Sequence, residues 1–84
     1  MEKQFWLSVA EIAARYGVSR VTAWRHAQNG TLTAPVRLSP GCTRWPAHEV
    51  EAIDRARLAG ADDDAIRALV KKLVADRAAA AQAA

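Results

Sequence analysis

Arginine, tryptophan and short polar side chains crowd the segment from residue 19 to residue 28, and their types suit binding to nucleic acid. The arginine guanidinium is a planar fork of N–H donors that fits phosphate oxygens and the guanine O6/N7 edge. Hydroxyl and amide side chains make the other common contacts to phosphates and bases. The candidate DNA-binding residues of this segment are Ser19, Arg20, Thr22, Trp24, Arg25 and Gln28.

The positive charge lies mostly in the same half of the chain. Residues 1–48 carry six basic and two acidic side chains, a balance of +4, whereas residues 49–84 carry six basic and seven acidic ones, a balance of −1. Arg37 and Arg44 belong to the basic half and complete the set of candidate DNA-binding residues. A basic half made mostly of arginine favours a polyanionic partner, although the charge alone fits a solvated basic face equally well.

Other kinds of chemistry have little support in the sequence. The single cysteine, Cys42, excludes a disulfide framework and a cysteine-rich zinc site. No glycine-rich phosphate loop and no nucleophile beside a base is present, and the consecutive acids Asp62–Asp64 splay around a helix axis. We therefore expect no enzyme, no catalytic residue, no cofactor, no metal ion and no small-molecule substrate.

Two helices joined by a short turn must position the residue 19–28 segment. Ser8 and Glu11 form a capping box that opens a helix over 9–16, and Gly17 ends it. Ser19 can cap a second helix over 20–29. This pattern indicates a helix-turn-helix, with an αα-hairpin that has no DNA role as the alternative. The expected inward positions are Ile12, Tyr16, Val18 and Ala23, and the expected outward positions are Ser19, Arg20, Val21, Trp24, Arg25 and Gln28.

Two aromatic side chains of the second helix admit more than one interpretation. Trp24 could be a buried anchor, but we favour a position along the DNA backbone or partly over the following hairpin. His26 falls on an inward position, where we expect a partly buried neutral imidazole rather than a metal ligand.

The segment 31–45 has the character of a β-hairpin. Val36-Arg37-Leu38 and Cys42-Thr43-Arg44-Trp45 alternate on either side of a Ser39-Pro40-Gly41 turn. We expect Val36, Leu38 and Trp45 to face the core and the two arginines to reach solvent or phosphate. A hairpin directly after such a second helix is a wing.

Two further helices follow the hairpin. Pro46 suits the first turn of a third helix that ends at Gly60, with an inner stripe of Val50, Ile53, the Arg57 stem and Leu58. A fourth, amphipathic helix is expected over 62–79, with a frayed tail over 80–84. Its apolar stripe could pack on its own domain or serve self-association, and it consists of Ile66, Leu69, Val70, Leu73 and Val74.

Length and composition limit the chain to one small core. Of its 84 residues 51% are hydrophobic, but twenty of those are alanine. No apolar run approaches the roughly 20 residues of a membrane span, and Ser8 interrupts the only N-terminal apolar run. We expect one cytoplasmic domain over 6–59, followed by the amphipathic helix.

The motifs resemble the AlpA family of prophage regulators, which is related to phage excisionases and MerR-type winged helix-turn-helix domains. The similarity covers residues 6–58. It is carried by Val18-Ser19-Arg20, Thr22-Ala23-Trp24-Arg25 and Gly30, by the run from Pro35 to Trp45, and by Glu49-Val50-Glu51-Ala52.

The resemblance implies a mainly α, winged helix-turn-helix protein of a phage or integrated element that binds double-stranded DNA and regulates transcription. Thr22, Trp24 and Arg25 match the family's recognition helix, and Arg44 and Trp45 match its returning wing strand. An excisionase, or a DNA-packaging adaptor similar to small terminase subunits, is the alternative. Because one small domain covers little DNA, we expect a homodimer or a cooperative array through residues 62–79.

Overall fold

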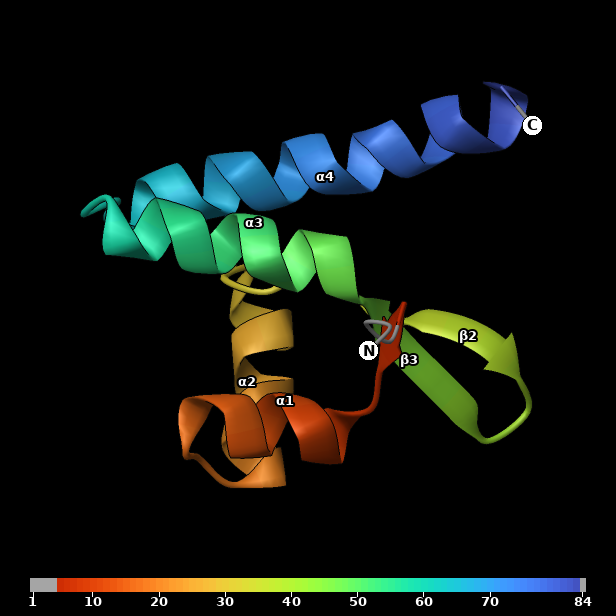
Figure 1. Cartoon of the computed structure of the whole chain (residues 1–84), viewed down its shortest axis with the longest axis horizontal. Helices are drawn as coiled ribbons and strands as arrows, with labels where there is room; N and C mark the ends of the chain where they lie inside the picture. The colour runs from red at the N-terminus through yellow and green to blue at the C-terminus, as the bar shows by residue number, and fades with distance from the viewer. Residues whose placement is uncertain (1–4, 84) are drawn as a thin grey trace.

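The computed structural model describes residues 5–83, which form four helices and a small sheet (Figure 1). In chain order the elements are β1 (Trp6–Leu7), α1 (Val9–Tyr16), α2 (Arg20–Asn29), β2 (Val36–Ser39), β3 (Cys42–Pro46), α3 (Ala47–Leu58) and α4 (Asp63–Ala83). The fold is therefore mainly helical with a small antiparallel sheet, which confirms the mainly α part of the predicted class.

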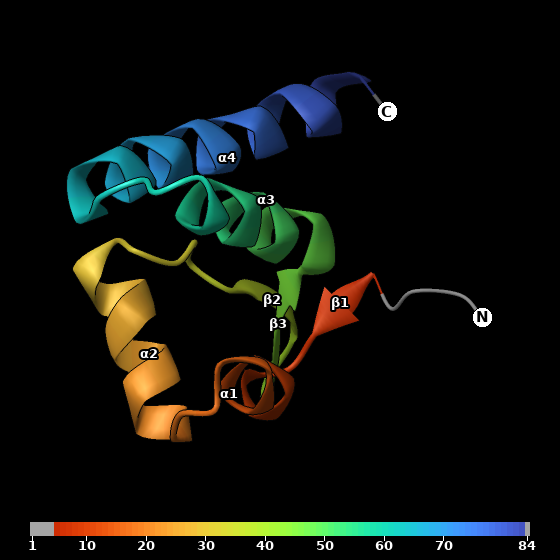
Figure 2. The same ribbon diagram turned by 60° about the vertical axis from the view of Figure 1, so that its left-hand side comes forward.

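The helices lie in three levels. α3 runs through the middle, α4 lies along one side of it, and α1 and α2 lie on the other side, as both views show (Figures 1 and 2). The β2–β3 hairpin projects from the body next to the start of α3 (Figure 1). α4 is thus the element farthest from α1.

The first pair of helices is set by local sequence signals, all of which the structure confirms. The Ser8 hydroxyl accepts from the Glu11 amide at 3.1 Å, and the Glu11 carboxylate accepts from the Ser8 amide at 2.9 Å. Gly17 ends α1 with a φ of 66°, a left-handed conformation that glycine adopts without steric cost. Ser19 then caps α2 by accepting from the Thr22 amide.

The sheet contains a strand that the sequence analysis did not predict. β3 lies in the middle of the order β1-β3-β2, and Trp6 pairs with Pro46 and Leu7 with Trp45. β1 has only two residues, so no alternating pattern could have revealed it. Its pairing to β3 joins the beginning of the chain to its middle.

One core holds these elements together. Buried side chains from α1, α2, β3, α3 and α4 form a single cluster: Ile12, Ala13, Ala23, Leu32, Trp45, Val50, Ile53, Ile66 and Val70. Trp45 is fully buried, and its indole N–H donates to the Thr33 carbonyl at 2.6 Å. Since Ile66 and Val70 belong to the cluster, α4 belongs to the same folding unit as the helices before it.

Three expected core positions are corrected by the structure. Leu38 is 45% exposed because it lies near the tip of the hairpin, beyond the reach of the core. Val36 lies on the opposite face of the hairpin from the buried Trp45, because Val36 pairs with Arg44 and successive residues of a strand point to opposite faces. Leu58 is 88% exposed, since it is the last residue of α3.

α4 is longer than expected and lies against its own chain. It continues to Ala83 instead of ending at residue 79, because alanine has the highest helix propensity. Arg77 of α4 forms a bidentate ion pair with the fully buried Glu49 of α3. Its Nε and Nη2 atoms donate to the two carboxylate oxygens at 2.7 and 2.6 Å. Arg77 also donates to the Ala34 carbonyl at 2.7 Å. No helix in the described part of the chain is long and apolar enough to cross a membrane.

Candidate nucleic-acid interface

One face of α2 is open to solvent along its whole length. Val21, Trp24, Arg25 and Gln28 follow the spacing i, i+3, i+4 and i+7, which places them on one side of the helix. All four are exposed, as are Ser19 and Arg20 at the helix start. Val21 is 66% exposed, an unusual position for a β-branched apolar residue, and the expected set of DNA-binding residues omits it.

The hydroxyl residues at the start of α2 have a structural task. Ser19 Oγ accepts from the Thr22 amide at 3.1 Å and donates to Thr22 Oγ1 at 3.0 Å. Thr22 itself is half-buried. These two hydroxyl groups therefore hold the first turn of α2, whereas the arginines beside them remain available.

Trp24 connects α2 to the sheet. Its ring centroid lies 5.1 Å from that of Trp45, with the two planes tilted by 59°. Trp24 remains 37% exposed, so it is not a buried anchor and partly covers the base of the β2–β3 hairpin. The contact fixes the exposed face of α2 relative to β3.

The two hairpin arginines lie on opposite faces of the sheet. Arg44 pairs with Val36, so these two side chains share a face, and Arg37 shares the other face with Trp45. Arg37 therefore lies on the face that Trp24 contacts. Arg44 is half-buried and donates to the Thr43 carbonyl at 2.8 Å. Arg37, rather than Arg44, thus shares the sheet face of Trp45, the residue that Trp24 of α2 contacts.

The arginines divide into two groups by their partners. Within residues 5–80, the ion pairs of the structure involve basic residues outside the candidate set: Arg15 with Asp54, Arg67 with Asp64, Lys72 with Asp76 and Arg77 with Glu49. Arg20, Arg25, Arg37 and Arg44 have no acidic partner in that part of the chain. Arg55 and Arg57 of α3 also have no acidic partner there, so the paired arginines are those of α1 and α4, and no ion pair compensates the charge of α2 and the hairpin.

Asp54 of α3 forms hydrogen bonds to two residues at the end of α1. Its two carboxylate oxygens accept from Arg15 Nε at 2.7 Å and from the Tyr16 hydroxyl at 2.5 Å. Burial of the phenol, together with its hydrogen bond to Asp54, raises the pKa of Tyr16 well above its usual value. No sequence signal pointed to this bridge, because 38 residues separate Tyr16 from Asp54.

α4 reaches the far end of α2. Arg67 Nε donates to the Asn29 carbonyl at 3.0 Å, which satisfies one of the last carbonyl groups of that helix. Gly30 follows with a φ of 83°, and the Arg67 side chain lies 3.6 Å from where a β-carbon on Gly30 would be. Both ends of α2 are thus held, one by Ser19 and the other by Arg67.

The described residues contain no group of three or more histidine, cysteine, aspartate or glutamate side chains that could hold a metal ion. Comparison of the chain with protein-family models, curated proteins and solved structures finds no significant match.

Proposed function

We propose that the chain is a sequence-specific DNA-binding protein of a phage or integrated element, acting as a transcriptional regulator of the AlpA type. α1 and α2 would form a helix-turn-helix, with α2 in the major groove and the β2–β3 hairpin as a wing on the flanking backbone. The observation that carries this proposal is the charge division described above. Arg20, Arg25, Arg37 and Arg44 have no acidic partner among residues 5–80, whereas three of the five arginines outside α2 and the hairpin have one.

The exposed face of α2 has the length of a short DNA reading surface. From Val21 to Gln28 the helix rises about 10 Å, at roughly 1.5 Å per residue. This rise equals about three base pairs, at roughly 3.4 Å each. Arg25, in the middle of this face, would donate bidentately to guanine, a contact worth about 1–3 kcal/mol of discrimination.

The experiment is a binding titration on a selected DNA site and on scrambled DNA. Arg25→Ala should lose most of the preference for the selected site, because it removes a base contact. Arg37→Ala should weaken binding to both DNAs by similar factors, because it removes a phosphate contact. Lys71→Ala, which removes one exposed positive charge from α4, is the matched control and should change neither affinity.

The salt dependence gives an independent measurement. With about four cationic contacts, log affinity should fall against log salt concentration with a slope near −3 to −4. Arg37→Ala should reduce the magnitude of that slope by about one. Affinity that is indifferent to salt, or equal losses of specificity from Arg25→Ala and Arg37→Ala, would contradict the proposal.

One reading surface of this size needs a second one nearby. We expect two copies on paired sites about one helical turn of DNA apart, as a homodimer or a cooperative array. Ile66 and Val70 are already buried against α3, so the contact between copies would use the outer face and the far half of α4, where Val74 is 38% exposed. Footprinting across the source genome would show whether the sites lie at promoters, as a regulator requires.

A further inference from the structure

The β2–β3 hairpin carries an exposed leucine close to its tip. Leu38 is 45% exposed, and it has no cross-strand partner because the register shifts between Arg37 and Ser39. A bulge of this kind leaves one residue out of the ladder and changes the direction of its side chain. The hairpin projects from the body of the protein (Figure 1), so this apolar side chain lies outside the core. It is therefore available to a partner.

The charges around Leu38 favour DNA as that partner. Residues 31–48 contain no aspartate and no glutamate. Arg37 directly precedes Leu38 and is exposed, and Arg44 lies in the neighbouring strand. Neither arginine has an acidic partner among residues 5–80. An apolar side chain beside unpaired arginines suits the minor groove, where the negative potential attracts arginine and an apolar side chain can enter a base step.

The hairpin is long enough to reach a minor groove while α2 lies in the adjacent major groove. Trp45, at the base of the hairpin, contacts Trp24 of α2. From Trp45 to Gly41 in the turn, the strand rises about 14 Å, at roughly 3.4 Å per residue. The neighbouring minor groove lies about half a helical turn along the DNA, which is roughly 17 Å. The two lengths are comparable, so the hairpin would meet the DNA at that groove.

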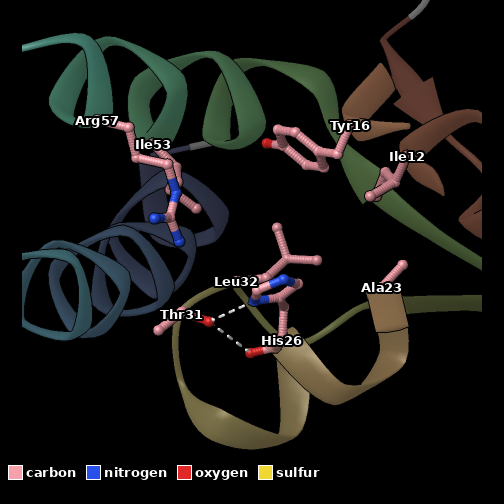
Figure 3. A pocket seen from close by; sticks show the side chains of 8 residues that line it. All are labelled: Ile12, Tyr16, Ala23, His26, Thr31, Leu32, Ile53 and Arg57. Atoms are coloured by element: carbon pink, nitrogen blue, oxygen red, sulfur yellow. Dashed lines mark hydrogen bonds between the residues drawn. The ribbon is translucent and has the colours of Figure 1, made fainter. Parts of the chain in front are cut away.

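The root of the hairpin is fixed to the body of the protein. In the loop before β2, the Thr31 hydroxyl is hydrogen-bonded to the imidazole and to the carbonyl of His26, at 3.0 and 3.2 Å (Figure 3). Further along, the Thr33 carbonyl accepts from the indole of the buried Trp45 at 2.6 Å, and the Ala34 carbonyl accepts from an arginine of α4 at 2.7 Å. Because these contacts fix the hairpin relative to α2, the binding of α2 would determine where the hairpin meets the DNA.

We infer that Leu38 enters the minor groove as a wedge between two base pairs and kinks the DNA. The inference rests on the proposed DNA-binding function and adds to it a distortion of the target. Side chains that partly unstack a base step in this way bend DNA by about 20–90° toward the major groove. Arg37 would contact the phosphate beside the opened step.

A wedge makes the protein sensitive to a base step with which it forms no hydrogen bond. Pyrimidine–purine steps, TA and CA/TG, unstack readily, whereas A-tracts are stiff. The preferred site should therefore contain such a step about five base pairs from the bases that face α2, which is half a turn along the DNA. Changing that step to AA, with the rest of the site unchanged, should weaken binding by the wild-type protein about fivefold.

Two fluorescence measurements on the selected DNA site test the inference with the full chain. Energy transfer between dyes at the two ends of the DNA should increase on binding, because a kink brings the ends closer together. 2-Aminopurine is an adenine analogue whose fluorescence increases when it unstacks. It should brighten several-fold when it is placed at the wedge step, and it should not brighten at the neighbouring positions.

Matched variants assign both signals to one side chain. Leu38→Ala should lose the two fluorescence changes and the preference for the flexible step, and it should still bind the site with the usual salt dependence. Leu38→Met keeps a large apolar side chain and should retain all three properties of the wild-type protein. Leu58→Ala is the control, because it removes a leucine that is 88% exposed at the end of α3 and lies away from the hairpin. It should change none of them.

The inference and the proposed function fail in different ways. If the wild-type protein binds the selected site without a change in either fluorescence signal, the wedge is overturned and the DNA-binding function stands. The wedge is also overturned if Leu38→Ala retains the kink, or if it changes the oligomeric state of the protein instead, because the leucine would then contact another protein molecule. Absence of salt-dependent binding to DNA would overturn the proposed function together with the inference.

Discussion

Individual side chains of α2 have separate tasks, some holding the helix and others left free for a partner. Ser19 and Thr22 are engaged with each other at the first turn, and Trp24 rests on Trp45. Val21 makes no such contribution, because two thirds of its surface is exposed. Apolar side chains in the major groove commonly contact the methyl group of thymine. Under the DNA-binding function proposed above, Val21 would therefore be the residue of α2 best suited to read thymine.

Removing a single methyl group from the DNA tests this assignment. Replacing the contacted thymine by deoxyuridine should weaken wild-type binding about fourfold, the equivalent of ~0.8 kcal/mol for one buried methylene-sized group. Val21→Ala should bind more weakly and lose the difference between the two bases. If Val21→Ala retained the full preference for thymine, the methyl group would be read by another residue.

Tyr16 gives a prediction for pH dependence. Burial and the hydrogen bond to Asp54 raise the pKa of Tyr16 above its ordinary value of 10.0, so the folded protein retains the phenol proton where the unfolded chain loses it. Its contribution to stability is complete below pH 10 and falls as the pH rises further. Because the chain has one tyrosine, the ultraviolet absorbance of phenolate reports this group alone. As the pH is raised, this absorbance should increase only when the protein unfolds. The stability of Tyr16→Phe should lack the part of the pH dependence that comes from this group.

At the scale of the elements, α4 is bonded through its arginines to α2, to α3 and to the loop before β2. Arg67 meets the end of α2, and Arg77 joins Glu49 of α3 to the loop before β2. The Glu49 side chain has no exposed surface, whereas that of Arg77 is 26% exposed. The negative charge of the buried Glu49 carboxylate is therefore compensated by Arg77.

Arg77→Ala should destabilise the protein by about 3 kcal/mol, because it leaves a buried carboxylate without a partner. Urea unfolding measures the change, and adding Glu49→Gln should recover part of it. Lys72→Ala is the control, since its pair with Asp76 is solvent-exposed and 3.6 Å long. It should cost no more than about 0.5 kcal/mol. If both alanine variants lost a similar free energy of unfolding, the buried pair would contribute no more to stability than the exposed one.

The elements that the sequence predicts well are those fixed by neighbouring residues. Ser8, Gly17 and Ser19 determine where α1 and α2 begin and end through bonds that span three or four positions. The position of Leu38 could not be predicted in this way, because alternation does not show how far a hairpin extends beyond the core. The Arg77–Glu49 pair lay outside prediction for a related reason: one sequence does not reveal contacts across 28 positions.

At the scale of the whole molecule, the first three helices and α4 share one core. Ile66 is fully buried in the same cluster as Ile12 and Ile53. The expected boundary near residue 60 therefore marks a turn between two packed helices. A protein of this size has little stability to spare, because a short chain buries a small fraction of its surface.

A chain that ends at residue 61 should lose cooperative unfolding. Removing α4 exposes the surface that Ile66 and Val70 cover, worth about 1.5–3 kcal/mol for each side chain, and leaves Glu49 unpaired. This loss approaches the total stability typical of a small domain. Circular dichroism during heating should show a gradual change without a sharp midpoint. A sharp transition would show instead that residues up to 61 fold alone.

The order of the sheet leaves β2 as an edge strand whose outer N–H and C=O groups face no other strand. Such an edge can recruit a strand from another molecule and begin aggregation. Here the pairing with β3 is irregular between Arg37 and Ser39, and Pro35 and Pro40 flank the strand. A bulge, a charge and two residues without N–H donors make this edge a poor template for a further strand. The hairpin can thus extend into solvent as an isolated ribbon without promoting insoluble assembly.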